Sequence, residues 1–395
     1  MKHDVKFGVD RLLEDPAEYK KGRWGMVTNN SATCSGQPNT CSRKAMMDAG
    51  IPLVRLFSPE HGISGDLGDG EAVDDAQDPV TGLPVHSLYG QHMKPSKEFL
   101  HDLDGLFFDI PDIGARCYTY IWALSYVMEA CAETGTPIIL LDRINPLGGR
   151  LDHCEGPVLD TANCVSYLGR APVPMRHGLT TGEFARWLSA EWQLQLDLKV
   201  IPNSGWSRPL LWPDTGLPFS AVSPAIQTFE SALCYPGTCL FEATNLSVGR
   251  NTKHAFQVVG APWLDPVALI SVLRSQNIPG VNPEYTIFVP SADPYEGEEC
   301  RGVALQITDR NAFRPVFTGL SMLTLIRNLF PSKFEWKPYP SAANPTGKNH
   351  FELLIGRYDW RKQLENNPEQ FIQELPGRLS VQQWGDEVSP HLLYD

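Results

Sequence analysis

The first 160 residues alternate short apolar runs with longer segments of mixed polarity. This alternation is typical of parallel β-strands joined by helical crossovers, because each crossover must carry the chain back to the same end of the sheet. It predicts an α/β fold with an open, Rossmann-like and mostly parallel sheet. The expected strands lie at residues 23–28, 53–57, 84–88, 105–110 and 137–141.

Two segments between these runs carry apolar residues at helical spacing, at 40–49 and 118–134. A glycine follows each of them, Gly50 and Gly135, and glycine readily takes the left-handed conformation that ends a helix. Both segments are therefore expected to be helices.

The second half of the chain mixes helices and strands in a different order. Residues 151–176 are rich in Gly, Pro and Cys and lack periodicity, so the connection between two lobes is expected there. We expect a Rossmann-like domain at 1–160 and an α+β domain at 161–395. The second domain should hold helices at 181–192, 266–274 and 319–329 and strands at 197–201 and 302–307, with long loops near 208–224 and 336–345.

The charge of the chain limits its partners. With 46 acidic and 33 basic residues the formal net charge is -13, and no dense Lys/Arg run offsets it. Such a chain repels phosphate backbones, so nucleic acid is not an expected partner. No apolar stretch approaches the roughly 20 residues needed to cross a bilayer, so no membrane insertion is expected.

The cysteines and the first residues bear on the cellular compartment. Nine scattered cysteines resemble neither a disulfide scaffold nor paired CxxC metal sites. The opening residues lack the apolar core of an export signal. We expect a cytoplasmic protein from the sequence as written, and a periplasmic or secreted one if an export signal was trimmed from it.

Polar side chains follow four of the predicted strands. In open parallel sheets, ligands bind outside the carboxyl ends of the strands. We therefore expect these side chains to meet at one rim and to contact a substrate. The candidates there are Asn29, Glu60, His61, Asp112, Arg116, Tyr118, Tyr120, Arg143 and Asn145.

Glu60 follows a proline at the end of the second strand. Gly62 and Gly65 behind it permit turns that other residues resist, so this site can hold a carboxyl group rigidly. A plainer interpretation makes Glu60 an ordinary loop acid or a helix cap, and His61 a packing residue.

The segment 109–120 combines two acids, an arginine and two tyrosines where a strand gives way to a helix. Sugars need this mixture, because hydroxyls require hydrogen bonds, rings require aromatic faces and carboxylates require a guanidinium group. In the plainer interpretation, Asp112 caps the helix and pairs with Arg116 while the tyrosines pack. The segment 142–149, which holds Arg143 and Asn145, could likewise be only a turn.

Several common enzyme motifs are absent from the sequence. It has no GxGxxG between a strand and a helix, no P-loop, no GxSxG and no HExxH. These absences disfavour a dehydrogenase, an NTPase, a serine esterase and a zinc protease.

A polar segment of the second half, 241–252, is the expected partner of the rim. Its Glu242, Asn245, Ser247 and Arg250 would face the first domain and complete a cleft between the domains, where small-molecule sites commonly lie. A surface loop could have the same composition.

The chain contains, in this order, the blocks SPEHG at 58–62, DIPDIGARCYTY at 109–120, DRINPLGG at 142–149, and FEATNLSVGRNT at 241–252 followed by GAPW at 260–263. Together they resemble the exo-β-N-acetylmuramidase family called NamZ, and the likeness runs from about residue 8 to the C-terminus. The resemblance implies a Rossmann-like N-terminal domain, a smaller C-terminal domain, an active site between them, and no metal or organic cofactor. It implies that the substrate is a peptidoglycan fragment ending in N-acetylmuramic acid.

The sequence departs from the family pattern at three positions. Ala243 and Asn251 stand where glycine is usual, and Ile144 replaces a common proline. None of these changes removes a candidate catalytic group. They bear on loop shape, and so on the preferred length of the substrate.

The implied reaction assigns roles to these residues. Glycoside hydrolysis needs an acid that protonates the leaving oxygen and a second group that meets the oxocarbenium-like centre. Glu60 is the expected acid. The second group is Glu242, Asp112 or the substrate's own acetamido group, and we favour Glu242. Arg116, Arg143 or Arg250 would bind the lactyl carboxylate of muramic acid, since a guanidinium fork matches a carboxylate.

Two alternatives from other classes stay open. Two α/β lobes around a cleft also describe non-catalytic sugar-binding proteins. An amidase or esterase of wall peptides would need an activated nucleophile, for which Cys117 and His61 are the candidate pair.

Overall fold

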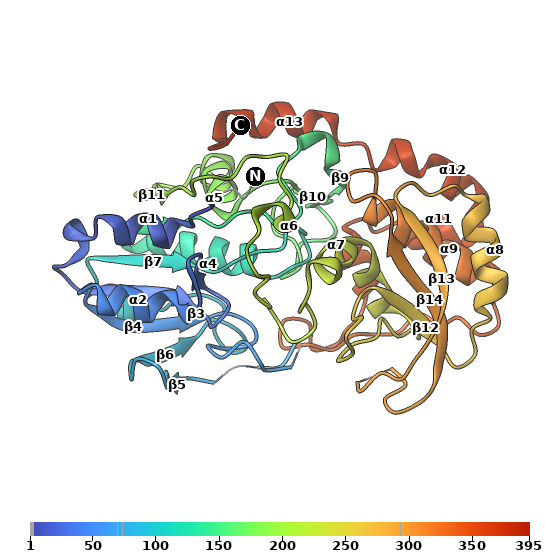
Figure 1. The fold of residues 1–395 in the computed structure, drawn as a ribbon, viewed down its shortest axis with the longest axis horizontal. Helices are drawn as coiled ribbons and strands as arrows, with labels where there is room; N and C mark the ends of the chain where they lie inside the picture. The colour runs from blue at the N-terminus through green and yellow to red at the C-terminus, as the bar shows by residue number, and fades with distance from the viewer. Residues whose placement is uncertain (1–3, 69, 73, 293) are drawn as a thin grey trace.

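The computed structural model describes residues 4–68, 70–72, 74–292 and 294–395 (Figure 1). A seven-stranded sheet forms the N-terminal part, in the order β11-β8-β7-β1-β4-β6-β5, and only the β5–β6 pair is antiparallel. The five predicted strands and the mostly parallel sheet are confirmed. The strands are β1 (Trp24–Thr28), β4 (Leu53–Ser58), β5 (Ala76–Gln77), β6 (Pro84–Ser87), β7 (Gly105–Asp109), β8 (Ile138–Leu141) and β11 (Leu198–Ile201).

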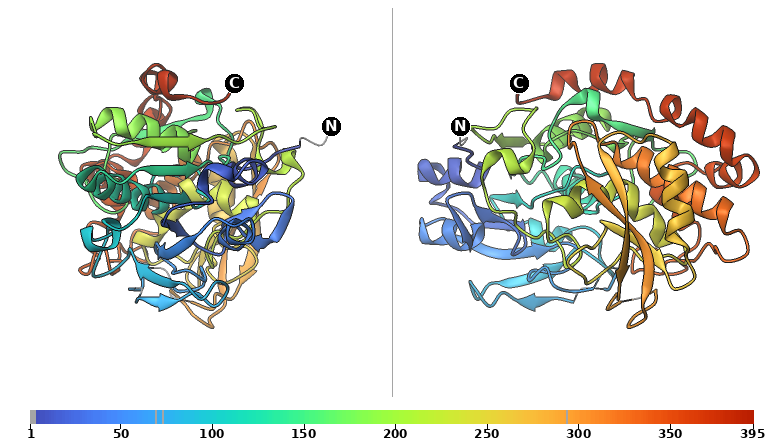
Figure 2. Two further views of the ribbon diagram at one scale, coloured as in Figure 1. Left: turned by 90° about the vertical axis from the view of Figure 1, so that its left-hand side faces the viewer. Right: turned by 45° about the vertical axis from the view of Figure 1, so that its right-hand side comes forward.

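Helices cover both faces of this sheet, as Figure 2 shows. On one face α1 contacts α2, and on the other α4 contacts α3 and α5. The central strands β1, β7 and β8 are buried along their whole length, which explains why their sequences read as unbroken apolar runs. The helices are α1 (Gly8–Glu14), α2 (Ser42–Asp48), α3 (Lys97–Leu100), α4 (Tyr120–Thr134) and α5 (Thr181–Glu191).

Glycine ends the helices α2 and α4 as predicted. Gly135 adopts a φ of +70°, and its N–H donates to the carbonyl oxygen of Cys131. Gly50 follows α2 with a φ of +87°. At both positions a residue with a Cβ atom would be strained.

The sheet extends further along the chain than residue 160. The segment 198–201 pairs in parallel with β8, so the predicted strand at 197–201 exists but belongs to the first sheet. The connection that precedes it carries α5 and a hairpin of β9 (Glu155–Val158) and β10 (Pro174–Arg176). β11 is an edge strand and only half-buried, so its sequence gives little sign of the sheet it joins.

The C-terminal part is α+β, as expected, and contains an antiparallel sheet in the order β12-β14-β13. The predicted helices at 266–274 and 319–329 and the strand at 302–307 are confirmed as parts of α8, α9 and β14. The elements are β12 (Val258–Ala261), β13 (Val281–Phe288), β14 (Cys300–Ile307), α7 (Phe229–Thr238), α8 (Pro266–Ser275), α9 (Pro315–Leu329), α10 (His350–Ile355), α11 (Trp360–Asn366), α12 (Pro368–Arg378) and α13 (Gln382–Val388).

Helix α9 is the centre of this domain and contacts α7, α8, α11 and α12. Its backbone touches that of α7 where Gly237 meets Gly319. A Cβ atom on Gly319 would lie 2.2 Å from the carbonyl oxygen of Gly237, so only glycine permits this approach.

The end of the chain returns to the first domain. Trp384 of α13 donates its indole N–H to the carbonyl oxygen of His177 at 2.9 Å, and the hydroxyl of Tyr394 donates to Asp142. The end of the chain thus packs against the first domain, and Figure 2 shows the C-terminus near the N-terminal end of the described chain. Within the described part of the chain, no helix is both long and apolar enough to cross a membrane.

Glu155 gives one testable consequence of this packing. Its buried carboxylate accepts the N–H of Phe317 at 3.0 Å, at the start of α9. Burial raises the pKa of Glu155 from 4.5 to about 7, although Arg176 opposes the shift. The folded state then binds a proton that the unfolded state has lost, so the free energy of unfolding falls as the pH rises from about 4.5 to about 7.

The variant Glu155→Gln should lack this dependence. Over that range the unfolding free energy of the parent is expected to fall, relative to the variant, by up to about 1.4 kcal/mol per pH unit. Urea denaturation at a series of pH values measures the difference. Parallel pH profiles for the two proteins would contradict it.

Candidate active site

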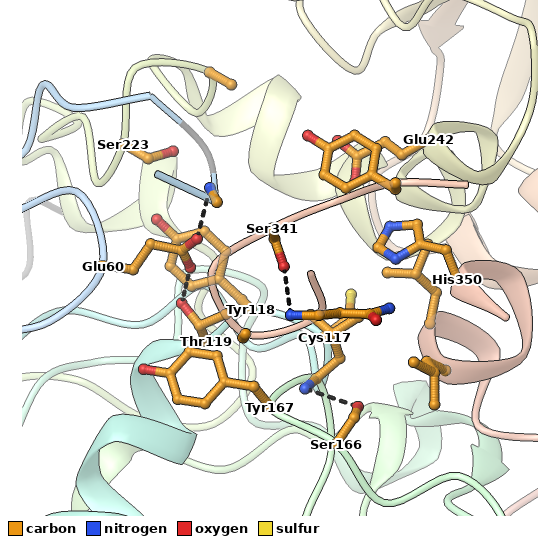
Figure 3. A pocket seen from close by; sticks show the side chains of 18 of the residues that line it. Glu60, Cys117, Tyr118, Thr119, Ser166, Tyr167, Ser223, Glu242, Ser341 and His350 are labelled. Atoms are coloured by element: carbon orange, nitrogen blue, oxygen red, sulfur yellow. Dashed lines mark hydrogen bonds between the residues drawn. The ribbon is translucent and has the colours of Figure 1, made fainter. Parts of the chain in front are cut away.

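A cavity of about 760 Å³, counted with its open side, lies between the two domains (Figure 3). Its walls come from the turn after β4, the start of α4, the connection between β9 and β10, and two segments of the C-terminal domain. The described residues that line it include Glu60, His61, Gly70, Cys117, Tyr118, Thr119, Tyr167, Ser223, Glu242, Arg250, Phe256, Tyr339 and His350.

Glu60 sits in the turn after β4 and is 4% exposed. His61 and Gly62 both have positive φ angles, of 69° and 72°, and this sharp turn directs the chain away from the sheet. The backbone N–H of Gly70 donates to one oxygen of Glu60 at 2.9 Å, and the Thr119 hydroxyl donates to the other at 2.7 Å (Figure 3). Both oxygens of the carboxyl group therefore have fixed positions.

Buried phenols surround this carboxyl group. Burial, and after it the charge of Glu60, raises the pKa of Tyr120 and of Tyr167 well above the ordinary value. Both phenols therefore keep their protons. The hydroxyl of Tyr167 has no hydrogen-bond partner among the described residues, so a ligand in the cavity can receive its proton in a hydrogen bond.

Glu242 and Arg250 form an ion pair on the C-terminal side of the cavity. Their side chains are 6% and 15% exposed, respectively. The guanidinium group of Arg250 also lies over the ring of Phe256, at 5.2 Å from its centre. An arginine in such a cavity can offer further N–H donors to an anionic ligand.

The segment 339–350 closes another side of the cavity. The ring of Tyr339 stacks on His350 at 4.6 Å between the ring centres. Ala342 donates its N–H at 2.7 Å to the carbonyl oxygen of Gly70, the residue whose own N–H binds Glu60. The C-terminal domain is thus linked to the turn that carries Glu60.

Comparison with known proteins agrees with this architecture. A family model described as "Exo-beta-N-acetylmuramidase NamZ, N-terminal" matches residues 24–230, and its C-terminal counterpart matches residues 233–394. The chain belongs to the NamZ family. It is 39% identical over 380 residues to the peptidoglycan β-N-acetylmuramidase NamZ of Bacillus subtilis, covering 95% of this chain and 90% of that one.

Two solved structures share the fold over nearly the whole chain. Both are DUF1343 family proteins from Bacteroides fragilis, and each is 28% identical to this chain. One has a TM-score of 0.88 with full coverage of both chains, and the other a TM-score of 0.75 with 99% coverage of each. The two NamZ family models meet between residues 230 and 233, whereas the domain division predicted from the sequence lies at residue 160.

Arg116 is not among the described residues that line the cavity. It is fully buried, and its guanidinium group donates to the carbonyl oxygens of Pro157, Val173 and Leu354 at 2.7–2.9 Å. These acceptors belong to both halves of the chain. In this NamZ family member Arg116 therefore joins the two domains.

Arg143 has a comparable structural position. It forms two hydrogen bonds with the carboxylate of Asp109, at 2.6 and 2.8 Å, and a third with the carbonyl oxygen of Thr33 at 2.7 Å. Both charged side chains are almost completely buried. Nε, Nη1 and Nη2 of the Arg143 guanidinium group therefore each already donate to a protein acceptor.

Replacing Arg143 by lysine tests this structural role. Lysine cannot reproduce the bidentate pair, so the free energy of unfolding should fall by about 1.5–3 kcal/mol. The KM for an N-acetylmuramide should stay within about twofold. Arg150→Lys, at an exposed pair with Asp152, is the matched control and should leave stability nearly unchanged. A raised KM at unchanged stability would instead assign Arg143 to the substrate.

Four other predicted residues hold loops in place. The Asn29 amide donates to the Tyr120 hydroxyl at 3.1 Å, and the Asn145 amide donates to the carbonyl oxygen of Leu179 at 3.0 Å. Asn245 exchanges hydrogen bonds with the segment 333–335. Ser247 accepts the N–H of Gly249 at 3.2 Å. None of the four is among the described residues that line the cavity.

Asp112 lies outside the cavity that holds Glu60. It accepts the N–H of Gly114 at 2.7 Å and approaches the ring of His177, at 3.5 Å from Nε2. With Arg143 it lines a separate space of about 370 Å³. Asp112 is thus not among the described residues that line the cavity with Glu60, whereas Glu242, Arg250, Tyr118 and His61 are.

Cys117 and His61 both line the cavity, but the described residues show no hydrogen bond between them. The Sγ of Cys117 lies 3.4 Å from the Sγ of Cys239, and Nδ1 of His61 is 2.8 Å from the carbonyl oxygen of Leu67. The nucleophile–base contact that an amidase or esterase needs is not formed here.

Four residues that line the cavity were not predicted from the sequence as site residues: Thr119, Tyr167, Tyr339 and His350. Thr119 lies in the segment 109–120 and could have been predicted as a site residue, because it directly precedes a helix that faces the rim. Tyr167 and the segment 339–350 lie in stretches without periodicity, and only the fold brings them to the cavity.

Proposed function

We propose that this protein is an exo-acting glycoside hydrolase that releases N-acetylmuramic acid from the non-reducing ends of peptidoglycan fragments. The proposal rests on one cavity that holds a carboxyl group and a carboxylate–guanidinium ion pair. A rigidly held carboxyl, Glu60, lies on one side, and the Glu242–Arg250 pair lies on the other. Membership of the NamZ family supports the same reaction.

Glu60 is the proposed general acid. In its protonated form it gives a proton to the glycosidic oxygen while the bond from that oxygen to the anomeric carbon breaks. Water then adds to the anomeric carbon and transfers a proton to a carboxylate of the site, either Glu60, which regains its protonated form, or Glu242. The contacts from Gly70 and Thr119 support this role, because proton transfer requires a carboxyl group held within hydrogen-bond reach of the leaving oxygen.

Glu242 is the proposed protein group that meets the oxocarbenium-like centre. It shares the cavity with Glu60, whereas Asp112 lines a different space. The acetamido group of the sugar is the alternative nucleophile, since some glycosidases use it in place of a second carboxylate.

Arg250 is the proposed site for the lactyl carboxylate. Of the three arginines considered, Arg116 and Arg143 donate to protein acceptors away from the cavity, and Arg250 lines it. A guanidinium group binds a carboxylate through two parallel hydrogen bonds. The Tyr167 hydroxyl is a further donor for the polar groups of the sugar.

Release of the aglycone from a chromogenic N-acetylmuramide tests the proposed reaction. The purified protein should release the chromophore together with free N-acetylmuramic acid. A protein that binds the substrate without releasing either product would instead be the sugar-binding module described above, and the hydrolase proposal would fail.

A further inference from the structure

A polar groove continues from the cavity on the side of Glu60. Ser223 lines both spaces, and the groove encloses about 1360 Å³ counted with its open side. One wall, residues 64–66, follows directly on the turn that carries Glu60. A second wall is the segment 218–224, and Asn30, Ser31 and Thr33, which follow β1, also line the groove.

Hydrogen bonds fix the wall at 218–224. The hydroxyl of Tyr120 donates to the carbonyl oxygen of Val222 at 2.9 Å and accepts the amide N–H of Asn29 at 3.1 Å. The hydroxyls of Ser220 and Thr33, which belong to different lining segments, lie 3.4 Å apart. These hydrogen bonds hold the segment 218–224 in place beside the end of β1.

The chemistry of the groove differs from that of the cavity. Amide and hydroxyl side chains such as Asn39, Ser220 and Gln227 line it, together with the half-buried ring of Phe219. Of the described lining residues only Asp66 is charged, and none is a cation. Such a surface fits an uncharged ligand rich in hydroxyl groups and gives no ion pair to a carboxylate.

We propose that this groove binds the uncharged sugar of the leaving chain, on the far side of the bond that Glu60 protonates; this inference rests on the proposed function. A general acid must lie beside the leaving oxygen, so the leaving sugar must lie next to Glu60. The wall at 64–66 begins four residues after Glu60. The muramic acid unit, with its carboxylate, occupies the cavity beside Arg250.

Filling the groove tests the proposal. Ala221 is exposed and lines the groove, so Ala221→Trp adds a bulky ring there without disturbing the core. We expect kcat/KM to fall on the order of tenfold for a muramic-acid-terminated glycan of four sugars. For a nitrophenyl N-acetylmuramide, whose aglycone is a single small ring, the change should stay within about twofold. Ala17→Trp, at an exposed site before the amino end of β1, is the control and should alter neither rate.

The outcomes separate this inference from the proposed function. If the parent protein cleaves neither substrate, the proposed function fails. If the parent cleaves both and Ala221→Trp slows both equally or neither, the groove does not bind the leaving sugar. A loss seen only with glycans that carry peptide stems would assign the groove to the peptide and overturn the proposal.

Discussion

Replacing Glu60 by glutamine is expected to lower kcat on a muramic-acid-terminated glycan by two orders of magnitude or more. Glutamine keeps the size of the side chain and its capacity to accept the N–H of Gly70. It cannot supply the proton that the leaving sugar needs. The loss should be smaller with a dinitrophenyl N-acetylmuramide, because dinitrophenolate leaves readily without a proton.

This dependence on the leaving group distinguishes an acid from a residue that only holds the turn. Thermal unfolding of the Glu60→Gln variant should match that of the parent closely. Glu71→Gln removes an exposed carboxyl group nearby on the chain and serves as the matched control, with turnover expected to be unchanged. Near-normal turnover of Glu60→Gln on the glycan would exclude Glu60 as the general acid.

Replacing Arg250 by methionine is expected to remove most of the preference for muramic acid. A charge-assisted pair of hydrogen bonds to the lactyl group stabilises binding by about 1.5–3 kcal/mol, so kcat/KM on an N-acetylmuramide should fall roughly ten- to a hundredfold. The corresponding N-acetylglucosaminide lacks the lactyl carboxylate, and its slower hydrolysis should change little. The ratio of the two rates is the quantity to measure.

Two further variants sharpen this test. Arg250→Lys keeps the charge but not the fork, and should restore only part of the preference. Arg310→Met removes an exposed arginine paired with Glu230 and should leave the ratio unchanged. An equal loss on both substrates for Arg250→Met would mean that Arg250 stabilises Glu242 or the loop and does not recognise the lactyl group.

Much of the N-terminal fold follows from local sequence. Central strands buried on both faces must be apolar throughout, and helix ends such as Gly135 need a left-handed backbone. The strand ends therefore predicted where Glu60 would lie. The pairing partner of β11 could not be predicted in this way, because the sequence pattern of a half-buried edge strand does not indicate which strand it pairs with.

The partners of the arginines could not be predicted either. Arg116 donates to carbonyl oxygens 41 and 238 positions away in sequence, and no local sequence pattern predicts such contacts. The same limit applies to the 339–350 segment, which reaches the cavity through the bond from Ala342 to Gly70. Residue types at strand ends thus indicate the chemistry of a rim, and only the fold shows which of these side chains line the cavity.

A crystal structure of the Glu60→Gln variant with a muramic-acid-terminated disaccharide would show directly whether Glu60 lies where a general acid must lie. We predict the glycosidic oxygen at about 3 Å from the side chain of residue 60, which is the reach of a general acid. The lactyl carboxylate should pair with Arg250, and the leaving sugar should point past Ser223 into the groove. A lactyl group bound at Arg143 would contradict the role of Arg250. A glycosidic oxygen beyond hydrogen-bond reach of residue 60 would contradict the role of Glu60 as the general acid.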